Sequence, residues 1–312
     1  MRRTTRPRLV AIWLLVAAVS IGPGLATAAT TPAAPADAND ADSCAKESGD
    51  AAIAACTRAI ASGNYHGRPL EKLYYNRAFE YHRKRDNELA IADYTEAIRI
   101  DSDDADAFYG RGNAWREMGD NARAIADYDE AIRLDPNRAA ALNNRGAASL
   151  AKGQNDRAVA DFSAAIRIDP RDPDYYNNRG DAWQLKGDND RAIADYDEAI
   201  HLNPRDPCPL YNRGHAWQAK GDNDHAIADY NEAIRLAPNY AAALNSRGTA
   251  WSDKGDSDRA IADYSAAIRA NPHFAPAFFN RGHAWRAKGD NARAIADLHE
   301  AIRLNPNFPE ER

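Results

Sequence analysis

Histidine and cysteine are the residues of this 312-residue chain with the widest range of chemistry, because they can ligate metals or act as nucleophiles. His215 and His283 are the candidate zinc ligands. Zinc requires ligands within a few Å of one ion, and these two residues are 68 positions apart in the sequence. We therefore expect no shared metal site.

Two of the three cysteines form a possible disulfide near the N-terminus. Cys44 and Cys56 flank a Ser-Gly-Asp turn, and the segment 53–60 (IAACTRAI) is similar to 91–98 (IADYTEAI). Disulfides are typical of oxidising compartments, where they stabilise small segments with little core of their own. We expect a Cys44–Cys56 bridge that staples an N-terminal cap.

Cys208 stands alone between two prolines, at the predicted start of a helix. The pKa of a thiol can fall at such a position. Two interpretations remain open, an intermolecular disulfide and a plain exposed residue.

Catalytic motifs are missing from the sequence outside a repeating pattern. No glycine-rich phosphate loop, metal cluster or nucleophile-base pair stands out, and the acids and histidines recur at repeat positions. We expect no enzymatic activity and no cofactor. The formal charge of -6 argues against nucleic acid or anionic lipid as the main partner.

The first 28 residues have the order of a secretory signal peptide. Four arginines precede an apolar run, residues 9–21, and then a helix-breaking Gly-Pro-Gly and Ala26-Thr27-Ala28. The run is shorter than the roughly 20 residues that span a bilayer. We expect cleavage, no stable membrane span and a periplasmic or secreted protein; the alternative is an uncleaved N-terminal anchor.

The rest of the chain is organised by a period of 34 residues, which is the signature of a repeat array. Residues 29–42 are expected to be a disordered Ala/Pro/Thr linker, 43–70 a helical cap and 309–312 a tail. Seven units lie between the cap and the tail. They are 71–104, 105–138, 139–172, 173–206, 207–240, 241–274 and 275–308.

Each unit is expected to form two helices, which makes the protein all-α. In 105–138 the first helix is predicted from Ala105 to Met118, with Gly119 at its end. The second is predicted to begin after the N-cap Asp120 and to end near Leu134. Within it, Asp129 and Arg133 are spaced as a favourable surface pair.

Small and large residues alternate across the predicted hairpin. Gly112 is nearly level with Tyr128, so its missing side chain can admit the ring, and Trp115 is level with Ala124. We expect these columns to form the core.

The unit resembles the tetratricopeptide repeat in its small, aromatic, alanine and proline positions, which are Gly112, Trp115, Ala124, Tyr128, Ala131 and Pro136. The resemblance extends over residues 71–308. The units resemble in particular a bacterial, exported subgroup of this family with Asn-Arg-Gly and Ala-Asp-Tyr motifs. The resemblance implies a right-handed superhelical solenoid. Its first helices would line a concave groove that binds a protein or peptide.

An arginine stands before the glycine position in every unit, where many family members have leucine. Arg111 is nearly level with Asp127 in its own unit and also level with Asp93 of the preceding unit. Because an unpaired buried charge is expensive, we predict a ladder of arginine-aspartate pairs within or between units.

The predicted contact strip for a partner is a row of asparagines before these arginines, interrupted by Gly110 and Ser246. Asparagine can hydrogen-bond a peptide backbone through its donor and its acceptor. The alternative is that these asparagines only satisfy neighbouring helices. The row consists of Asn76, Asn144, Asn178, Asn212 and Asn280.

Varied neighbours of this row are expected to supply specificity, because aromatic residues among polar groups make good anchors. They include Tyr109, Tyr211, Phe279, His215 and His283. The leading hypothesis is an exported, non-enzymatic interaction scaffold.

Two irregularities complete the prediction. Ser149 replaces tryptophan in the unit 139–172, which is the expected flexible joint. No helix is expected after the last unit, so its apolar edge could stack on a second copy. The alternative function is therefore a self-assembling structural spacer.

Overall fold

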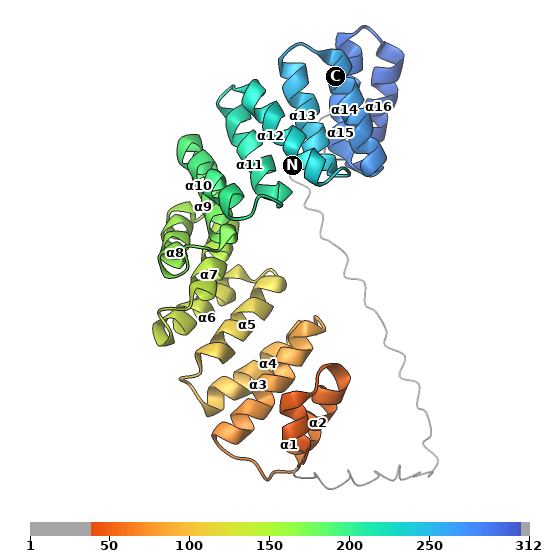
Figure 1. The fold of residues 1–312 in the computed structure, drawn as a ribbon. Helices are drawn as coiled ribbons and strands as arrows, with labels where there is room; N and C mark the ends of the chain where they lie inside the picture. Colours follow the sequence, from red (N-terminus) through yellow and green to blue (C-terminus); the bar gives the residue numbers. More distant parts are fainter. Residues whose placement is uncertain (1–38, 307–312) are drawn as a thin grey trace, which may run out of the picture. The chain divides into compact units, whose positions relative to one another are not determined.

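The described part of this computed structural model, residues 39–306, consists of α-helices joined by turns and short loops and contains no strand. A short pair, α1 (Asn39–Lys46) and α2 (Gly49–Ala61), comes first (Figure 1). The first helices of the hairpins that follow are α3 (Arg68–Arg83), α5 (Ala105–Glu117), α7 (Ala139–Ala151), α9 (Pro173–Leu185), α11 (Pro207–Ala219), α13 (Ala241–Asp253) and α15 (Ala275–Ala287). The second helices are α4 (Asn87–Ile100), α6 (Asn121–Leu134), α8 (Asn155–Ile168), α10 (Asn189–Leu202), α12 (Asn223–Leu236), α14 (Ser257–Ala270) and α16 (Asn291–Leu304). The predicted all-α repeat fold is confirmed.

The hairpins stack in chain order, each second helix packing between its own first helix and the next one. First helices also contact the first helices of neighbouring units, as α9, α11 and α13 do. No such contact joins consecutive second helices among residues 39–306. The first helices therefore lie closer together than the second helices, as they must on the inner side of a curved array.

The turn inside each hairpin follows from two residues of its sequence. Gly119 has φ +81°, a left-handed conformation that costs a glycine little, and it ends the first helix. The Asp120 side chain then accepts a hydrogen bond from the Arg123 backbone N–H at 3.0 Å and caps α6. The predicted helix limits and N-cap of this unit are confirmed to within a residue.

The core depends on glycine and alanine, which let the two helices of a hairpin approach closely. A Cβ placed on Gly112 would lie 2.8 Å from Cε1 of Tyr128, so any larger residue would clash with the ring. Ala124 and Ala131 are fully buried beside the tyrosine. The predicted glycine-tyrosine contact is confirmed.

The tryptophans pack against the buried residues of this core from its edge, in agreement with the predicted core column. Trp115 is only half-buried, and the Arg123 guanidinium lies 4.1 Å from its ring centroid. Arg259 covers Trp251 in the same way at 3.8 Å. The indole rings pack on alanine with one face and carry a cation on the other, which suits their position near the turn.

The helices α1 and α2 act as a short additional hairpin at the N-terminal end. Cys44 and Cys56 form the predicted disulfide between them, and both residues are buried. The Arg77 Nη1 donates a hydrogen bond to Thr57 Oγ1 of α2 at 3.0 Å, as Arg111 does to Thr95 in the next unit. In this hairpin the disulfide replaces the glycine-tyrosine contact of the full repeats.

The boundary expected between linker and cap differs from the structure. The helix α1 begins at Asn39, inside the segment expected to be disordered, because Asp40 is buried against Arg58 at 2.6 Å. The predicted signal peptide and tail lie outside the described residues. Within residues 39–306, no helix combines the length and apolar character needed to cross a bilayer.

The unit built from α7 and α8 lacks a side-chain cap on both helices, as the α3–α4 unit also does, and its core differs at Ser149. Arg138 and Gln154 precede these helices and make no side-chain cap, unlike Asp120. Ser149 is fully buried, and its hydroxyl has no hydrogen-bond partner among the described residues. That this unit is a flexible joint stays a prediction.

Candidate functional site

One arginine-aspartate pair joins the first helix to the second in each of the seven hairpins. Arg111 of α5 donates from Nε and Nη2 to the two carboxylate oxygens of Asp127 on α6, at 2.8 and 2.7 Å. This two-pronged geometry is the strongest that an arginine can make with a carboxylate. The pairs are Arg77–Asp93, Arg111–Asp127, Arg145–Asp161, Arg179–Asp195, Arg213–Asp229, Arg247–Asp263 and Arg281–Asp297.

The remaining arginine nitrogen reaches back to the preceding unit. Arg145 Nη1 donates to Asp129 of α6 at 2.6 Å, and Arg179 Nη1 donates to Ser163 of α8 at 3.1 Å. The arginine-aspartate pairs predicted within units are therefore confirmed. The alternative pairing of Arg111 with Asp93 of the preceding unit does not form, and Arg111 Nη1 donates to Thr95 instead. Each arginine ties its own hairpin together and ties that hairpin to the one before.

The surface pair predicted between Asp129 and Arg133 is wrong. Asp129 accepts from Arg145 and also from Arg157 at 2.5 Å, whereas Arg133 pairs with Glu130 at 2.6 Å. The carboxylate is drawn away by two arginines of the following unit, which sequence spacing within one helix does not reveal.

The asparagine row joins each first helix to the preceding one. Asn178 of α9 donates through its amide to Asn143 of α7 at 2.9 Å, and Asn280 of α15 donates to Asn245 of α13 at 3.0 Å. Asn144 donates to the Tyr109 hydroxyl at 3.1 Å. Asn76 makes no bond of this kind among the described residues. The amide donors of the bonded asparagines serve the fold, as the alternative interpretation held, and partner binding by this row stays a prediction.

A second polar column links the row to the core tyrosines. Asp181 accepts from the Tyr196 hydroxyl at 2.7 Å and from Asn212 of the next unit at 3.0 Å. Burial raises the pKa of Asp181, and burial also raises the pKa of Tyr196. The bonds thus connect three consecutive helices, α9, α10 and α11, beneath the inner face.

The two interruptions of the row have steric causes. A Cβ on Gly110 would lie 2.5 Å from the Tyr94 ring of α4, so no asparagine fits there. At Ser246 the longer His215 supplies the reach instead, and its Nε2 lies 3.1 Å from the serine Oγ. Burial lowers the pKa of His215. A large residue in one unit is matched by a small one in the next.

The predicted aromatic anchors are partly engaged with the scaffold. Tyr109 lies beneath the Arg138 guanidinium at 5.3 Å, and the Tyr211 ring is 4.6 Å from His215 and 5.0 Å from Tyr240. The Phe279 ring lies 4.4 Å from His283. The structure thus brings Tyr211 together with His215, and Phe279 with His283, in two separate units.

Two apolar residues of the first helices that were not singled out from the sequence are more exposed than these. Phe79 of α3 is 45% exposed and Leu185 of α9 is 65% exposed. Nothing in the repeat pattern marks them, because each occupies a position where other units have different residues.

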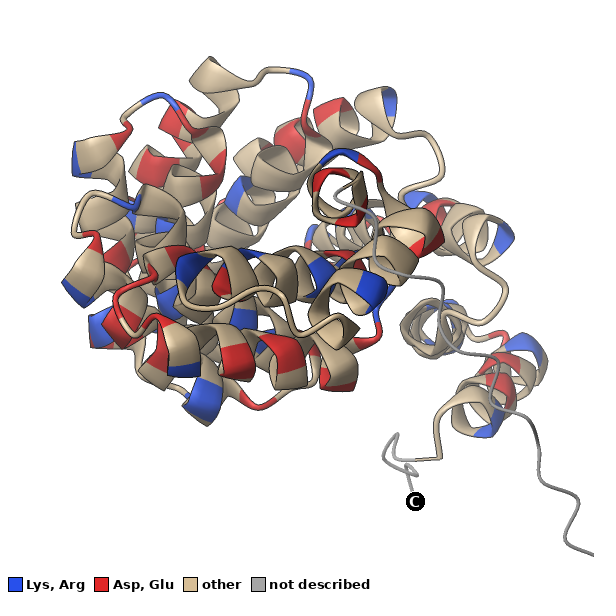
Figure 2. Ribbon diagram, turned by 90° about the horizontal axis from the view of Figure 1, so that it is seen from below, with Lys and Arg blue, Asp and Glu red and all other residues tan. Residues whose placement is uncertain are grey.

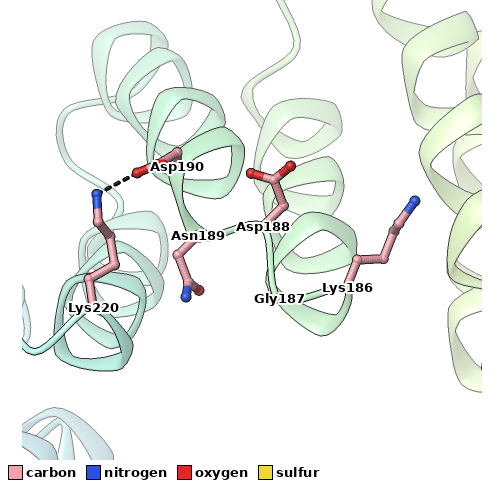
Figure 3. Close-up of a pocket in the computed structure, with 6 residues that line it drawn as sticks. All are labelled: Lys186, Gly187, Asp188, Asn189, Asp190 and Lys220. Carbon is pink, nitrogen blue, oxygen red and sulfur yellow. Dashed lines mark hydrogen bonds and ion pairs between the residues drawn. The ribbon is translucent and has the colours of Figure 1, made fainter.

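Lysine-aspartate pairs join neighbouring turns at the hairpin tips, and sequence analysis missed them. Lys220 pairs with Asp190 beside a shallow polar hollow, whereas Lys186 extends away from this hollow toward Asp156 (Figure 3). The signal was available, since these lysines and aspartates recur at the same period of 34. Charges paired in this way stabilise the stack and leave the hollow without a reactive group.

Another missed group is Glu71 of α3, which is fully buried. Lys72 Nζ lies 3.4 Å from its carboxylate and 3.0 Å from Asp104, the N-cap of α5. Burial, and then a hydrogen bond to Asp104, raise the pKa of Glu71 to about 7. The other units have alanine or proline here, so this acid is particular to the first hairpin.

The charges of the molecule are mixed in sign along the helices (Figure 2). Among residues 39–306, no group of three or more His, Cys, Asp or Glu side chains is arranged to hold a metal ion.

Sequence models of the tetratricopeptide repeat match most of the described chain. One matches residues 116–173, 143–207 and 252–309, and others match 80–119 and 207–240. No protein of curated function matches the chain.

Solved structures of the same architecture are similar to this one. A tetratricopeptide repeat protein of Parabacteroides merdae is 18% identical with a TM-score of 0.64, over 76% of this chain and 94% of that one. MamA of Desulfovibrio magneticus is 25% identical with a TM-score of 0.52, over 55% and 96%. The Cut9–Hcn1 structure is 18% identical with a TM-score of 0.61 over 82% of this chain, which spans about half of that chain's length.

Proposed function

Because the chain belongs to the tetratricopeptide repeat family, whose fold is that of protein interaction scaffolds, we propose that it binds a segment of a partner protein along its first helices. It does so as a non-enzymatic adaptor. The scaffold supplies position and hydrogen bonds, and the chemistry of recognition comes from side chains that differ between units.

One observation carries this proposal. The arginine-aspartate pairs have the same geometry in all seven hairpins, whereas the residue two positions after each arginine varies. It is phenylalanine in α3, aspartate in α9 and histidine in α11. A uniform frame that presents a different side chain at each step is suited to reading an extended segment.

Affinity capture tests the proposal with exposed apolar residues, whose replacement disturbs the fold little. The test variant carries Phe79→Asp and Leu185→Asp on first helices, and the control carries Leu89→Asp on the second helix α4, where Leu89 is 51% exposed. We expect a partner in envelope extract to bind the wild type and the control but not the test variant. Equal capture by all three proteins would place the binding surface elsewhere.

We also propose that the protein works outside the cytoplasm. The sequence of residues 1–28 supports export, and the Cys44–Cys56 disulfide is suited to an oxidising compartment. Fractionation of cells that express the full chain should recover it in the periplasm or medium, and deletion of residues 2–28 should leave it in the cytoplasm. Equal distribution of both forms would contradict export by this segment.

A second candidate function is self-association through α16. Ile295 of this helix is 54% exposed, whereas its equivalents Ile125, Ile193 and Ile227 are 6 to 7% exposed beneath the next hairpin. Light scattering at increasing concentration should detect oligomers of the wild type that Ile295→Glu abolishes. A monomer at every concentration would rule this function out.

A further inference from the structure

One column of residues at the starting ends of the first helices changes character along the array. Its members stand five positions before each arginine of the pairs described above, and each faces the residue that precedes the next first helix. In the first units the facing residues are ion pairs. Lys72 lies 3.0 Å from Asp104, and Asp106 lies 2.5 Å from Arg138.

Between α9 and α11 the same two positions carry like charges. Asp174 faces Asp206 where Asp106 faces Arg138 two units earlier, and Asp172 is also close. None of these three carboxylates forms an ion pair with a described residue. Burial, and then repulsion from Asp172 and Asp206, raise the pKa of Asp174.

An apolar hollow adjoins this acidic pair at the next step of the column. It is lined by Pro207, Cys208, Ala237, Pro238, Asn239 and Tyr240. The Cys208 backbone N–H donates to Asp206 at 2.9 Å, so the acidic pair and the hollow share a helix end. The Tyr240 ring, 5.0 Å from Tyr211, forms one wall.

We propose that this junction docks a partner segment with an apolar side chain beside a lysine or arginine. The apolar side chain enters the hollow at Cys208 and Tyr240, and the cation lies between Asp174 and Asp206. The inference rests on the proposed function and names the chemistry of the segment that the first helices bind.

Charge complementarity selects this occupant. Neighbouring carboxylates without a counterion repel each other, and a docking cation relieves that repulsion, whereas an anion would increase it. A neutral apolar segment would fill the hollow and leave the acids unpaired. A basic residue next to an apolar one is the chemistry that uses both features together.

Alkylation of Cys208 reports on the hollow directly, because it is the free cysteine of the described chain and is exposed. The full chain with its disulfide intact is treated with iodoacetamide and followed by mass spectrometry. Two Gly/Ser nonapeptides serve as probes, one with a central Lys-Phe-Lys and one with Glu-Phe-Glu. We expect the basic peptide at a few times its Kd to slow alkylation about fivefold, and the acidic peptide to leave the rate unchanged.

Charge reversal supplies the matched variants. Asp174→Lys should abolish protection by the basic peptide, with protection expressed as the ratio of the alkylation rates of the same variant without and with peptide. Asp106→Lys makes the same change in α5, away from the hollow, and should leave protection intact. Equal protection by both peptides, or protection that survives Asp174→Lys, would overturn the proposal.

The outcome also separates this inference from the broader function. Failure of the basic peptide to protect Cys208 overturns the docking site, and the capture experiment with Phe79 and Leu185 variants still decides the function independently. If the basic peptide protects Cys208 but the wild type and the Phe79 and Leu185 variant capture partners equally, the docking site stands and binding along the whole inner face is overturned.

Discussion

The junctions between the first three hairpins and those between the fourth, fifth and sixth share one backbone geometry but differ in the side chains that meet there. At the first, Lys72 pairs with Asp104 and Asp106 with Arg138, so the positions close the stack. At the later junctions Asp174 opposes Asp206 and an open apolar hollow follows. The repeat fold therefore accommodates ion pairs at one set of junctions, and like charges with an apolar hollow at another, through changes of side chains alone.

The frame beneath both regions does not differ between them. Its arginine-aspartate pairs have the same two-pronged geometry at Arg111 in the first region and at Arg213 in the second. The pairs that hold the hairpins and the side chains that differ between units occupy separate columns of the same helices, so the second column can vary without loss of the first.

The largest effect is expected from substitutions that break the arginine-aspartate pairs common to both regions. Asp127→Asn and Asp195→Asn should each lower the free energy of unfolding by about 3 to 4 kcal/mol, because each leaves a largely buried guanidinium, that of Arg111 or of Arg179, without its carboxylate. Denaturant unfolding should give the same loss for both. A loss below about 1 kcal/mol, the size typical of exposed pairs, would contradict a structural role for the frame.

The next effect is confined to the N-terminal end. Replacing Cys44 and Cys56 by serine should cost about 2 to 3 kcal/mol, because the bridge closes a loop of 12 residues in the unfolded chain. In a repeat array this loss should appear as early opening of α1 and α2. Hydrogen exchange that rises equally in α13 would contradict such a local effect.

Glu71 makes the first junction sensitive to pH. Its pKa is about 7 in the folded chain and lower when unfolded, so the folded state holds the proton more tightly and loses stability as pH rises from about 4.5 to 7. Glu71→Gln should therefore stabilise the protein by roughly 2 kcal/mol at pH 8 and have little effect at pH 4. Thermal unfolding with the same pH dependence in both proteins would contradict this.

The smallest effect compares the two junctions directly. Asp174→Asn should raise the free energy of unfolding by about 0.5 kcal/mol by relieving repulsion, and Asp106→Asn should lower it by about the same amount by removing a partner of Arg138. Urea unfolding of both variants measures the contrast. Changes of the same sign would show that the junctions do not differ as described.

The sequence was sufficient for the features that repeat. They include the period of 34 and the turn at Gly119 and Asp120. Local helix geometry also places Arg111 opposite Asp127 in the hairpin. The Cys44–Cys56 bridge was also predictable, because the surrounding segment copies the second helix of a unit. Helix pairs in contact within one repeat leave little freedom in register.

Contacts between units were harder to predict, because they depend on how far each hairpin rotates on the next. The tip pairs such as Lys220 with Asp190, and the meeting of Asp174 with Asp206, join residues 30 and 32 positions apart on separate helices. The asparagine bonds were considered only as an alternative for the same reason. A column read along one helix does not show which side chain of the neighbour it meets.

Site-specific photo-crosslinking tests the central claim, that the first helices bind a partner segment, most directly. A benzoylphenylalanine at Leu185 of α9 reports on the inner face, and the same residue at Leu89 of α4 is the control, since both leucines are more than half exposed. The account predicts a crosslinked partner from Leu185 and none from Leu89. Crosslinking from Leu89 alone, or equally from both, would contradict it.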